Sequence, residues 1–204
     1  MNTKTHWEHI YQKKGPREVS WYQEHAQSSL QYIRNTGLQK TGHIIDVGGG
    51  ASTLVDDLVA DGYQQISILD VSAHALQLAR QRLGVKASQV NWIEADITQA
   101  DLPHEAYDLW HDRAVFHFLT QSADRERYIE TVRQAVRPGG HVIIATFAPD
   151  GPERCSGLEV MRYSPESLHN EFGDGFEFVD GSREVHHTPF GTEQRFIYCY
   201  CRRG

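Results

Sequence analysis

Two carboxylates stand around a run of glycines at a spacing that suits a ligand site. Asp46 lies two residues before three consecutive glycines, Gly48, Gly49 and Gly50. Asp70 follows 20 residues after the last of them. Glycines let the backbone turn sharply and let a ligand approach it closely, and nucleotide-binding folds place an acid at this distance to hold ribose hydroxyls. The spacing therefore predicts a nucleoside site, although glycines needed only for packing a turn would give the same pattern.

The elements around these residues are expected to be two strands and a helix. Residues 43–47 form a short apolar run before the glycines. Residues 54–61 carry apolar and polar side chains at helical spacing, and Gly62 ends the pattern. A second apolar run, residues 66–69, leads to Asp70. This order predicts one strand–helix–strand unit, with the free N–H groups of the helix N-terminus just beyond the glycine turn.

The charge of Asp46 narrows the class of ligand. Its carboxylate would repel a pyrophosphate, and a dinucleotide motif would need a glycine where the chain has Thr53, so a nicotinamide-dependent reductase is the weaker interpretation. The pattern Asp46-x-Gly48-x-Gly50 followed by Asp70 resembles motif I and the next strand's acid of class I S-adenosylmethionine (SAM) methyltransferases. SAM carries a sulfonium and an ammonium but no phosphate. The resemblance implies that Asp46 and the three glycines contact this cofactor.

The same resemblance implies cofactor contacts at the ends of the next two strands. The third strand is expected at residues 90–93. Asp70 would hold the ribose hydroxyls, and Val71 would line one face of the adenine. Asp96 would accept the exocyclic amine, and Ile97 would line the other face. The alternative role for Asp96 is to cap the next short helix.

A second group of candidates follows the fourth strand, which is expected at residues 107–111. Parallel strands end at the same edge of a sheet, so Asp112 and Arg113 should lie beside the cofactor loops. Lysine methyltransferases of this superfamily have an acid, a basic residue and a small residue here, and Asp112, Arg113 and Ala114 fit that pattern. The resemblance implies that Asp112 contacts the cofactor and takes part in catalysis, and that Arg113 contacts the acceptor.

The residues that come next depart from the lysine methyltransferase pattern. Where those enzymes tend to have threonine, aspartate and a small residue, this chain has Val115, Phe116, His117 and Phe118. We expect Phe116 and His117 to face the acceptor. A neutral imidazole can take a proton from a thiol, amine or hydroxyl near neutral pH, so His117 is a candidate catalytic base. Packing in the core is the alternative role for this histidine.

The N-terminal segment carries aromatic residues at a recognisable spacing. Trp7 and Tyr11 fall on one predicted helix, and Trp21 and Tyr22 begin another that extends to about residue 37. This arrangement resembles the N-terminus of the methyltransferase-like lysine methyltransferases, such as those acting on elongation factor 1A and on citrate synthase. The resemblance implies a lid in which Trp21 covers the cofactor and Tyr22 reaches the acceptor. The alternative is that these aromatic residues only pack the second helix on the sheet.

The C-terminal part is expected to close the fold. Residues 137–140 form a turn before a fifth strand at 141–147, and two further strands are expected at 176–185 and 193–201. After the fifth strand, residues 148–163 are too rich in glycine, proline and polar residues for a regular element. A loop of this length at the ligand edge is usually functional. It carries two predicted acceptor contacts, Arg154 and Tyr163.

Composition limits the class of protein. The net charge of −7 gives no electrostatic case for nucleic acid, and no apolar run reaches the ~20 residues of a membrane span. The three cysteines form no disulfide framework, so a reducing cytoplasm is expected. Cys199 and Cys201 would share one face of a strand, where core packing is expected rather than a metal pair. The 12 histidines show no metal-binding spacing, so no metal is expected.

Together these features predict an α/β fold of the Rossmann-like class I methyltransferase type. It should have seven mostly parallel strands with an antiparallel last strand, and helices on both faces. We expect a single domain over residues 1–204, with lid helices at 1–37, a cofactor-binding core at 43–147, and a substrate loop and closing hairpin at 148–204.

The expected function is SAM-dependent methyl transfer to a small thiol, amine or related metabolite. Two alternatives remain open. The N-terminal resemblance and the acidic net charge, which would suit a basic surface, favour a protein lysine as acceptor. A non-catalytic SAM-binding domain is the other alternative.

Overall fold

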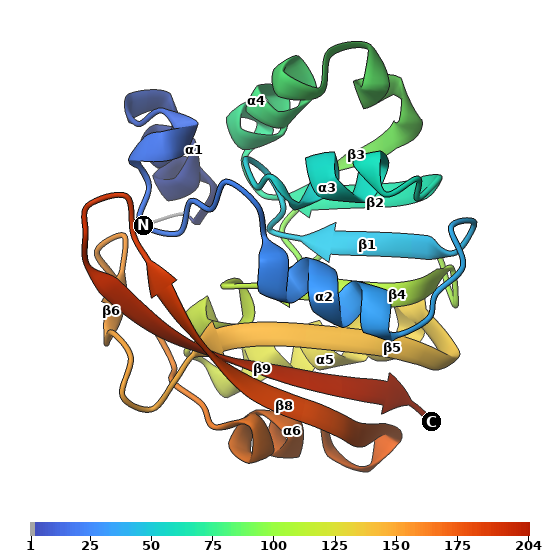
Figure 1. Ribbon diagram of the computed structural model, residues 1–204. Coiled ribbons are helices and arrows are strands. Elements are labelled where there is room, and N and C mark those ends of the chain that lie inside the picture. Colours follow the sequence, from blue (N-terminus) through green and yellow to red (C-terminus); the bar gives the residue numbers. More distant parts are fainter. Residues whose placement is uncertain (1–2) are drawn as a thin grey trace.

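The computed structural model describes residues 3–204. Its main strands are β1 (His43–Val47), β2 (Gln65–Asp70), β3 (Val90–Glu94), β4 (Tyr107–Arg113), β5 (Val136–Phe147), β8 (Phe176–His187) and β9 (Glu193–Arg203). They form one seven-stranded sheet in the order β3-β2-β1-β4-β5-β9-β8, which Figure 1 shows. Strands β1 to β5 are parallel, and β9 runs antiparallel to both β5 and β8. The predicted fold class is confirmed.

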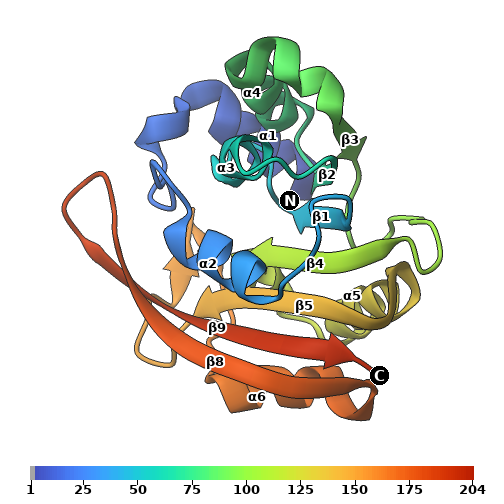
Figure 2. The same cartoon turned by 45° about the vertical axis from the view of Figure 1, so that its right-hand side comes forward.

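Helices cover both faces of this sheet (Figures 1 and 2). The α-helices are α1 (Thr3–Lys13), α2 (Gln27–Asn35), α3 (Leu54–Ala60), α4 (Ala73–Leu83), α5 (Ser122–Ala135) and α6 (Pro165–Phe172). Short 3-10 helices are η1 (Pro16–Glu18), η2 (Gly84–Gln89), η3 (Phe116–Phe118) and η4 (Gly173–Gly175). Apolar side chains of α2, α3 and α4 pack on one face, and those of α5 and α6 pack on the other. The sheet is therefore the central layer of three.

Local sequence signals account for several element boundaries. The Ser72 hydroxyl accepts a hydrogen bond from the Ala75 N–H at 3.1 Å and so caps α4. Ser164 caps α6 in the same way, with Pro165 at the first helical position. Strand β1 is buried on both faces apart from its first residue, as its apolar run predicts.

Some boundaries differ from those expected. The second helix begins at Gln27 rather than near Ser20. Contacts with the distant β8–β9 hairpin hold the Ser20 backbone in a loop: His186 Nε2 donates to the Ser20 carbonyl at 2.7 Å, and Gln194 donates to its hydroxyl at 3.3 Å. Strand β5 starts at Val136 rather than at residue 141, after a register shift against β4. Tertiary pairing overrides the local turn signal in both cases.

Two segments lie beyond the carboxyl ends of the parallel strands. Helix α1 is one, and the small hairpin of β6 (Arg154–Cys155) and β7 (Leu158–Glu159) is the other; both are on the left of Figure 1, past the arrowheads of β1 and β5. The segment predicted to be irregular therefore contains a short regular element at the ligand edge. Over the same residues 3–204, no helix is long and apolar enough to cross a membrane.

Candidate functional site

A hollow with two lobes opens at the carboxyl ends of β1, β2 and β4. The larger space encloses about 790 Å³, including the part open to solvent, which is within the size range of ligand sites. The lobes share four residues: Tyr11, Trp21, Gly48 and Arg113. The first lobe is otherwise lined by Trp7, Val47, Leu69, Asp70, Val71, Ala95, Asp96, Ile97, Ala114, Val115, Phe118, Leu119 and Cys155. The second is otherwise lined by Val19, Tyr22, Gln23, Ala26, Ser29, Asp46, Gly49, Ala51, Ser52, Thr53, Leu54 and His111.

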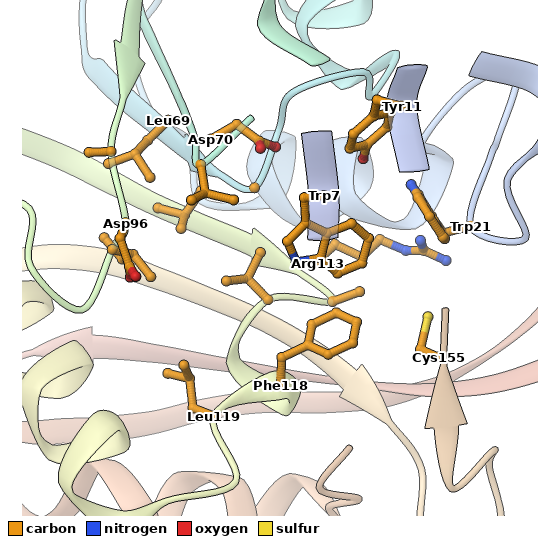
Figure 3. A pocket seen from close by; sticks show the side chains of 17 residues that line it. Trp7, Tyr11, Trp21, Leu69, Asp70, Asp96, Arg113, Phe118, Leu119 and Cys155 are labelled. Carbon is orange, nitrogen blue, oxygen red and sulfur yellow. The ribbon is translucent and has the colours of Figure 1, made fainter. Parts of the chain in front are cut away.

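One end of the first lobe is acidic. Figure 3 shows Asp70 and Asp96 there, with Trp21 and Cys155 at the opposite end. The Asp70 carboxylate accepts hydrogen bonds from the backbone N–H of Ser72 at 2.8 Å and of Gly50 at 3.0 Å. Burial raises the pKa of this carboxyl from its usual 3.8 to about 7. A ligand that donates hydrogen bonds would therefore stabilise its ionised form.

The predicted adenine contacts meet in this same end of the lobe. Val71, Asp96 and Ile97 all line it. Asp96 Oδ1 also accepts hydrogen bonds from the N–H and hydroxyl of Thr98, at 3.0 and 2.8 Å. No helix lies between β3 and β4, so Asp96 holds a turn rather than capping a helix, and it lines the lobe at the same time.

At all three glycine positions the protein's own atoms leave no room for a side chain. Gly48 has a φ of +70°, and a Cβ there would lie 2.0 Å from Cγ2 of Val115. A Cβ on Gly49 would lie 2.3 Å from Asp46 Oδ2, and one on Gly50 would lie 2.4 Å from an Asp70 oxygen. A side chain at any of these positions would meet protein atoms before it met a ligand. The close turn nevertheless brings Gly48 to the wall of both lobes.

Four aromatic side chains cover the hollow, and we call them the aromatic cap: Trp7, Tyr11, Trp21 and Phe118. The Trp7 ring lies edge-on to Phe118, with centroids 5.1 Å apart, and to Trp21 at 5.7 Å. Tyr11 lies 6.1 Å from Trp21. Figure 3 shows these rings gathered at one side of the lobe. Trp21 therefore lines the hollow together with both aromatic residues of α1, whereas Tyr22 lines only the second lobe.

Arg113 lies at the junction of the two lobes. Its guanidinium donates to Glu184 Oε1 on β8 at 2.9 Å and lies over the Phe196 ring, 4.1 Å from its centroid. The side chain is only 10% exposed. The ion pair and the ring hold this cation in place, so Arg113 is a rigid part of the wall.

Asp112 lies outside the hollow, contrary to what the sequence suggested. It is fully buried and accepts hydrogen bonds from the backbone N–H groups of Val115 and Phe116, at 2.8 and 3.0 Å. The Tyr128 hydroxyl of α5 donates to it at 2.6 Å. Successive side chains of a strand point to opposite faces, and Asp112 points to the α5 face. Its carboxylate shapes the turn into η3 and reaches neither lobe.

Phe116 and His117 are also absent from the hollow. Phe116 packs in the core against Tyr128, and His117 lies between Phe118 and Phe147, with ring centroids 4.5 and 4.7 Å away. Both are fully buried, and both ring nitrogens of His117 lack a hydrogen-bond partner among the described residues. Burial lowers the pKa of His117 to about 3. The structure thus places this histidine as a neutral packing residue, and Phe118 takes the place at the wall expected for its neighbours.

The long loop contributes a different residue from those expected. Arg154 is exposed and lies 3.5 Å from Glu159, and Tyr163 is buried and donates to Glu171 at 3.1 Å. Neither lines a lobe. Cys155 of β6 does, and burial raises the pKa of its thiol to about 11. Hairpin pairing turns Cys155 toward the hollow and leaves Arg154 outside.

Within residues 3–204, no group of three or more His, Cys, Asp or Glu side chains lies close enough together to hold a metal ion. Cys199 and Cys201 are buried on β9 with their sulfurs 3.5 Å apart.

The placement of Asp112 leads to a prediction about stability. Asp112→Ala removes the acceptor for two buried donors, the Phe116 N–H and the Tyr128 hydroxyl, and for the half-buried N–H of Val115. A buried donor left unpaired costs roughly 1–3 kcal/mol. We expect the free energy of unfolding, measured by urea denaturation, to fall by about 3 kcal/mol or more. Asp101→Ala, at an exposed acid, is the control and should change little. Unchanged stability combined with lost turnover would instead restore a catalytic role for Asp112.

Several wall residues were missed by sequence reasoning. In the first lobe they are Val47, Leu69, Ala95, Ala114, Val115, Phe118, Leu119 and Cys155. In the second lobe they are Val19, Gln23, Ala26, Ser29, Ala51, Ser52, Thr53, Leu54 and His111. Most of the first set are apolar residues directly beside predicted positions, so extending each motif by one residue would have found them. His111 is different, because only the register of β4 against β1 brings it opposite Asp46.

Comparison with known proteins agrees with this geometry. A family model described as a methyltransferase domain matches residues 44–140, from β1 into β5. The eEF1A lysine and N-terminal methyltransferase of Danio rerio is 22% identical over 148 residues, which are 71% of this chain and 21% of that protein. The chain therefore spans about a fifth of the length of that relative. The human EEF1A lysine methyltransferase 2 is 19% identical over 194 residues, covering 88% of this chain and 76% of that protein.

Solved structures share the whole fold. One of them has a TM-score of 0.81 and 16% sequence identity to this chain; it comes from a study of the conversion of a disulfide bond into a thioacetal group during echinomycin biosynthesis. The match covers 99% of this chain and 92% of that one, so the likeness extends through α1 and the closing hairpin. Residues 44–140 thus match a methyltransferase domain, the strand order and the glycine turn are those of the class I methyltransferase fold, and the chain resembles SAM-dependent methyltransferases of this class, the lysine methyltransferase group among them.

Proposed function

We propose that the chain transfers the methyl group of SAM to a small-molecule acceptor, a thiol, an amine or a related metabolite. The aromatic cap is the observation that carries this proposal. Trp7 and Trp21 contact each other, and Trp7 contacts Phe118, directly over the hollow. The space beneath suits an acceptor small enough to be enclosed with the cofactor.

The residues of the hollow fit the parts of SAM. Asp70 would accept the ribose hydroxyls, and Asp96 would accept the adenine amine between Val71 and Ile97. The second lobe, with Asp46 and Gly49 in its wall, would receive the amino acid end of the cofactor. The methyl group would then lie near the junction at Gly48, which both lobes share.

Methyl transfer from SAM requires little acid–base catalysis by the protein. The acceptor's electron pair forms a bond to the methyl carbon, the carbon–sulfur bond breaks, and its pair returns to sulfur and neutralises the sulfonium. Among the described residues, the titratable groups at the end of the first lobe near the cap are Cys155, Tyr11 and Arg113, and burial raises the pKa of the first two. An acceptor that is already nucleophilic, such as a free amine or a thiolate, suits this wall best. The protein would act by alignment and exclusion of water.

A protein lysine is the second candidate acceptor. The aromatic residues of α1 and of the loop after this helix resemble the N-terminus of lysine methyltransferases, and this resemblance supports a lysine acceptor. Relatives named for lysine methylation support it as well. An open groove beside the second lobe would admit an extended segment, since Tyr22 and Gln23 line both spaces. The charge of this groove is mixed, because Arg17 and Glu24 both line it and Glu184 is paired with Arg113.

A labelling assay separates the two acceptors. The protein is given SAM with a labelled methyl group, together with either a panel of thiols and amines or a cell protein extract. We expect label in the small-molecule fraction. Label confined to one protein band would contradict the small-molecule proposal and favour the lysine.

A variant of the cap tests the enclosed site. Phe118→Ala should lower kcat about 10-fold through looser alignment of acceptor and methyl group. Affinity for S-adenosylhomocysteine, measured by calorimetry, should change much less. The control is Phe178→Ala, a partly exposed phenylalanine on β8 outside the hollow. Equal kcat in both variants would show that Phe118 does not enclose the acceptor.

A further inference from the structure

A chain of buried hydrogen bonds runs from the second lobe into the interior of the protein. Asp46 Oδ1 lies 2.6 Å from His111 Nδ1, and His111 Nε2 lies 2.9 Å from the Ser29 hydroxyl. That hydroxyl lies 2.9 Å from the hydroxyl of Tyr198. All four side chains are buried, and they come from β1, β4, α2 and β9. Of these four residues, the proposed methyl transfer uses only Asp46.

The end of this hydrogen-bonded chain at Asp46 has a defined direction. A carboxylate oxygen accepts, so His111 donates to Asp46 Oδ1 through Nδ1–H. Nε2 of the same ring contacts the Ser29 hydroxyl, which in turn contacts the Tyr198 hydroxyl. These contacts fix the orientation of the imidazole, and the imidazole fixes the Asp46 carboxylate.

The second oxygen of Asp46 is left without a partner. Among the described residues nothing donates to Oδ2, although the atom is buried. It lies under the glycine turn, where a Cβ on Gly49 would be 2.3 Å away. A buried acceptor with no donor costs roughly 1–3 kcal/mol. Because Asp46, His111 and Ser29 all line the second lobe, a ligand in that lobe can supply the missing donor.

We infer that His111, backed by Ser29 and Tyr198, is a positioning residue that holds Asp46 with its free oxygen ready for the ammonium group of the cofactor. The inference rests on the proposed function, since it needs the amino acid end of SAM in the second lobe. The ammonium donates to Oδ2, which stays available because His111 bonds only to Oδ1. Removing the imidazole would let the carboxylate rotate and weaken this one contact.

Two ligands isolate that contact. S-adenosylhomocysteine has the amino acid end, and 5′-methylthioadenosine has the same adenosine and sulfur without it. In calorimetry, His111→Leu should weaken binding of the first on the order of 10-fold, the worth of one charge-assisted hydrogen bond. Binding of the second should be nearly unchanged. Ser29→Ala and Tyr198→Phe should show the same selective loss, smaller with each step away from Asp46.

Conservative and matched variants complete the test. In His111→Asn the amide nitrogen takes the place of Nδ1, so this variant should recover most of the affinity for S-adenosylhomocysteine. His141→Leu is the control, because His141 lies on β5 away from Asp46 and contacts the Tyr200 hydroxyl of β9, at 2.7 Å. It should leave both ligands unaffected.

The outcomes separate this inference from the proposed function. If the unaltered protein binds neither ligand, the cofactor site itself is wrong. If it binds both, and His111→Leu weakens both equally or neither, the positioning role of His111 is overturned while the cofactor site stands.

Discussion

Gly48→Val should abolish detectable binding of S-adenosylhomocysteine. The added Cβ would lie 2.0 Å from Val115 Cγ2, and the φ of +70° disfavours any branched side chain. The turn would have to move away from Val115, and this turn forms part of the wall of both lobes. Calorimetry measures the binding, and a thermal melt shows whether the protein still folds.

The matched control is another glycine of the same strand–helix–strand unit. Gly62 has a φ of +86°, but a Cβ there would meet nothing within 4 Å. Gly62→Val therefore shares the backbone strain of Gly48→Val without its collision, and it should lose some stability while binding normally. The double variant Gly48→Ala with Val115→Ala removes the colliding methyl and should regain part of the affinity. Normal binding by Gly48→Val would show that the turn is not part of the cofactor site.

Asp70→Ala should weaken binding of S-adenosylhomocysteine on the order of 100-fold. Two charge-assisted hydrogen bonds to the ribose would be lost, at about 1.5–3 kcal/mol each. The backbone N–H groups of Gly50 and Ser72 would also lose their acceptor. A folded variant that binds with unchanged affinity would contradict the ribose contact.

The pH dependence gives a second readout for Asp70. Its pKa in the free protein is raised to about 7, so the carboxyl holds its proton more tightly there than in the unfolded chain. The free protein therefore loses stability from this group as pH rises from about 4 to 7. Ribose hydroxyls favour the ionised form, so affinity should rise with pH up to about 7 and then level off. Asp70→Ala should remove this rise.

The sequence was most informative where local chemistry dictates structure. Ser72 and Ser164 each cap a helix through their own hydroxyl, so the helix starts could be predicted. The glycine turn and Asp70 belong to one strand–helix–strand unit, and the lengths of its elements bring Asp70 beside the turn. These signals depend on residues close in the chain and need no knowledge of the rest of the fold.

The sequence was least informative at η3, just after β4. A 3-10 helix of three residues has no periodicity from which to read its inward face, so Phe116, His117 and Phe118 could not be told apart. Asp112 stands at a strand end where catalytic acids are common, yet its carboxylate turns back to hold this helix. His111 was missed for a related reason, because its partner Asp46 is 65 residues away and only the sheet register pairs them.

The aromatic cap has a consequence for how the enzyme can be observed. Two of the four tryptophans of the chain, Trp7 and Trp21, lie over the hollow. Of the others, Trp110 is fully buried in the core and Trp92 lies beneath Arg80. A ligand that binds in the hollow would change the surroundings of the first pair directly. Intrinsic tryptophan fluorescence should therefore report the arrival and departure of such a ligand, and their rates, without a label.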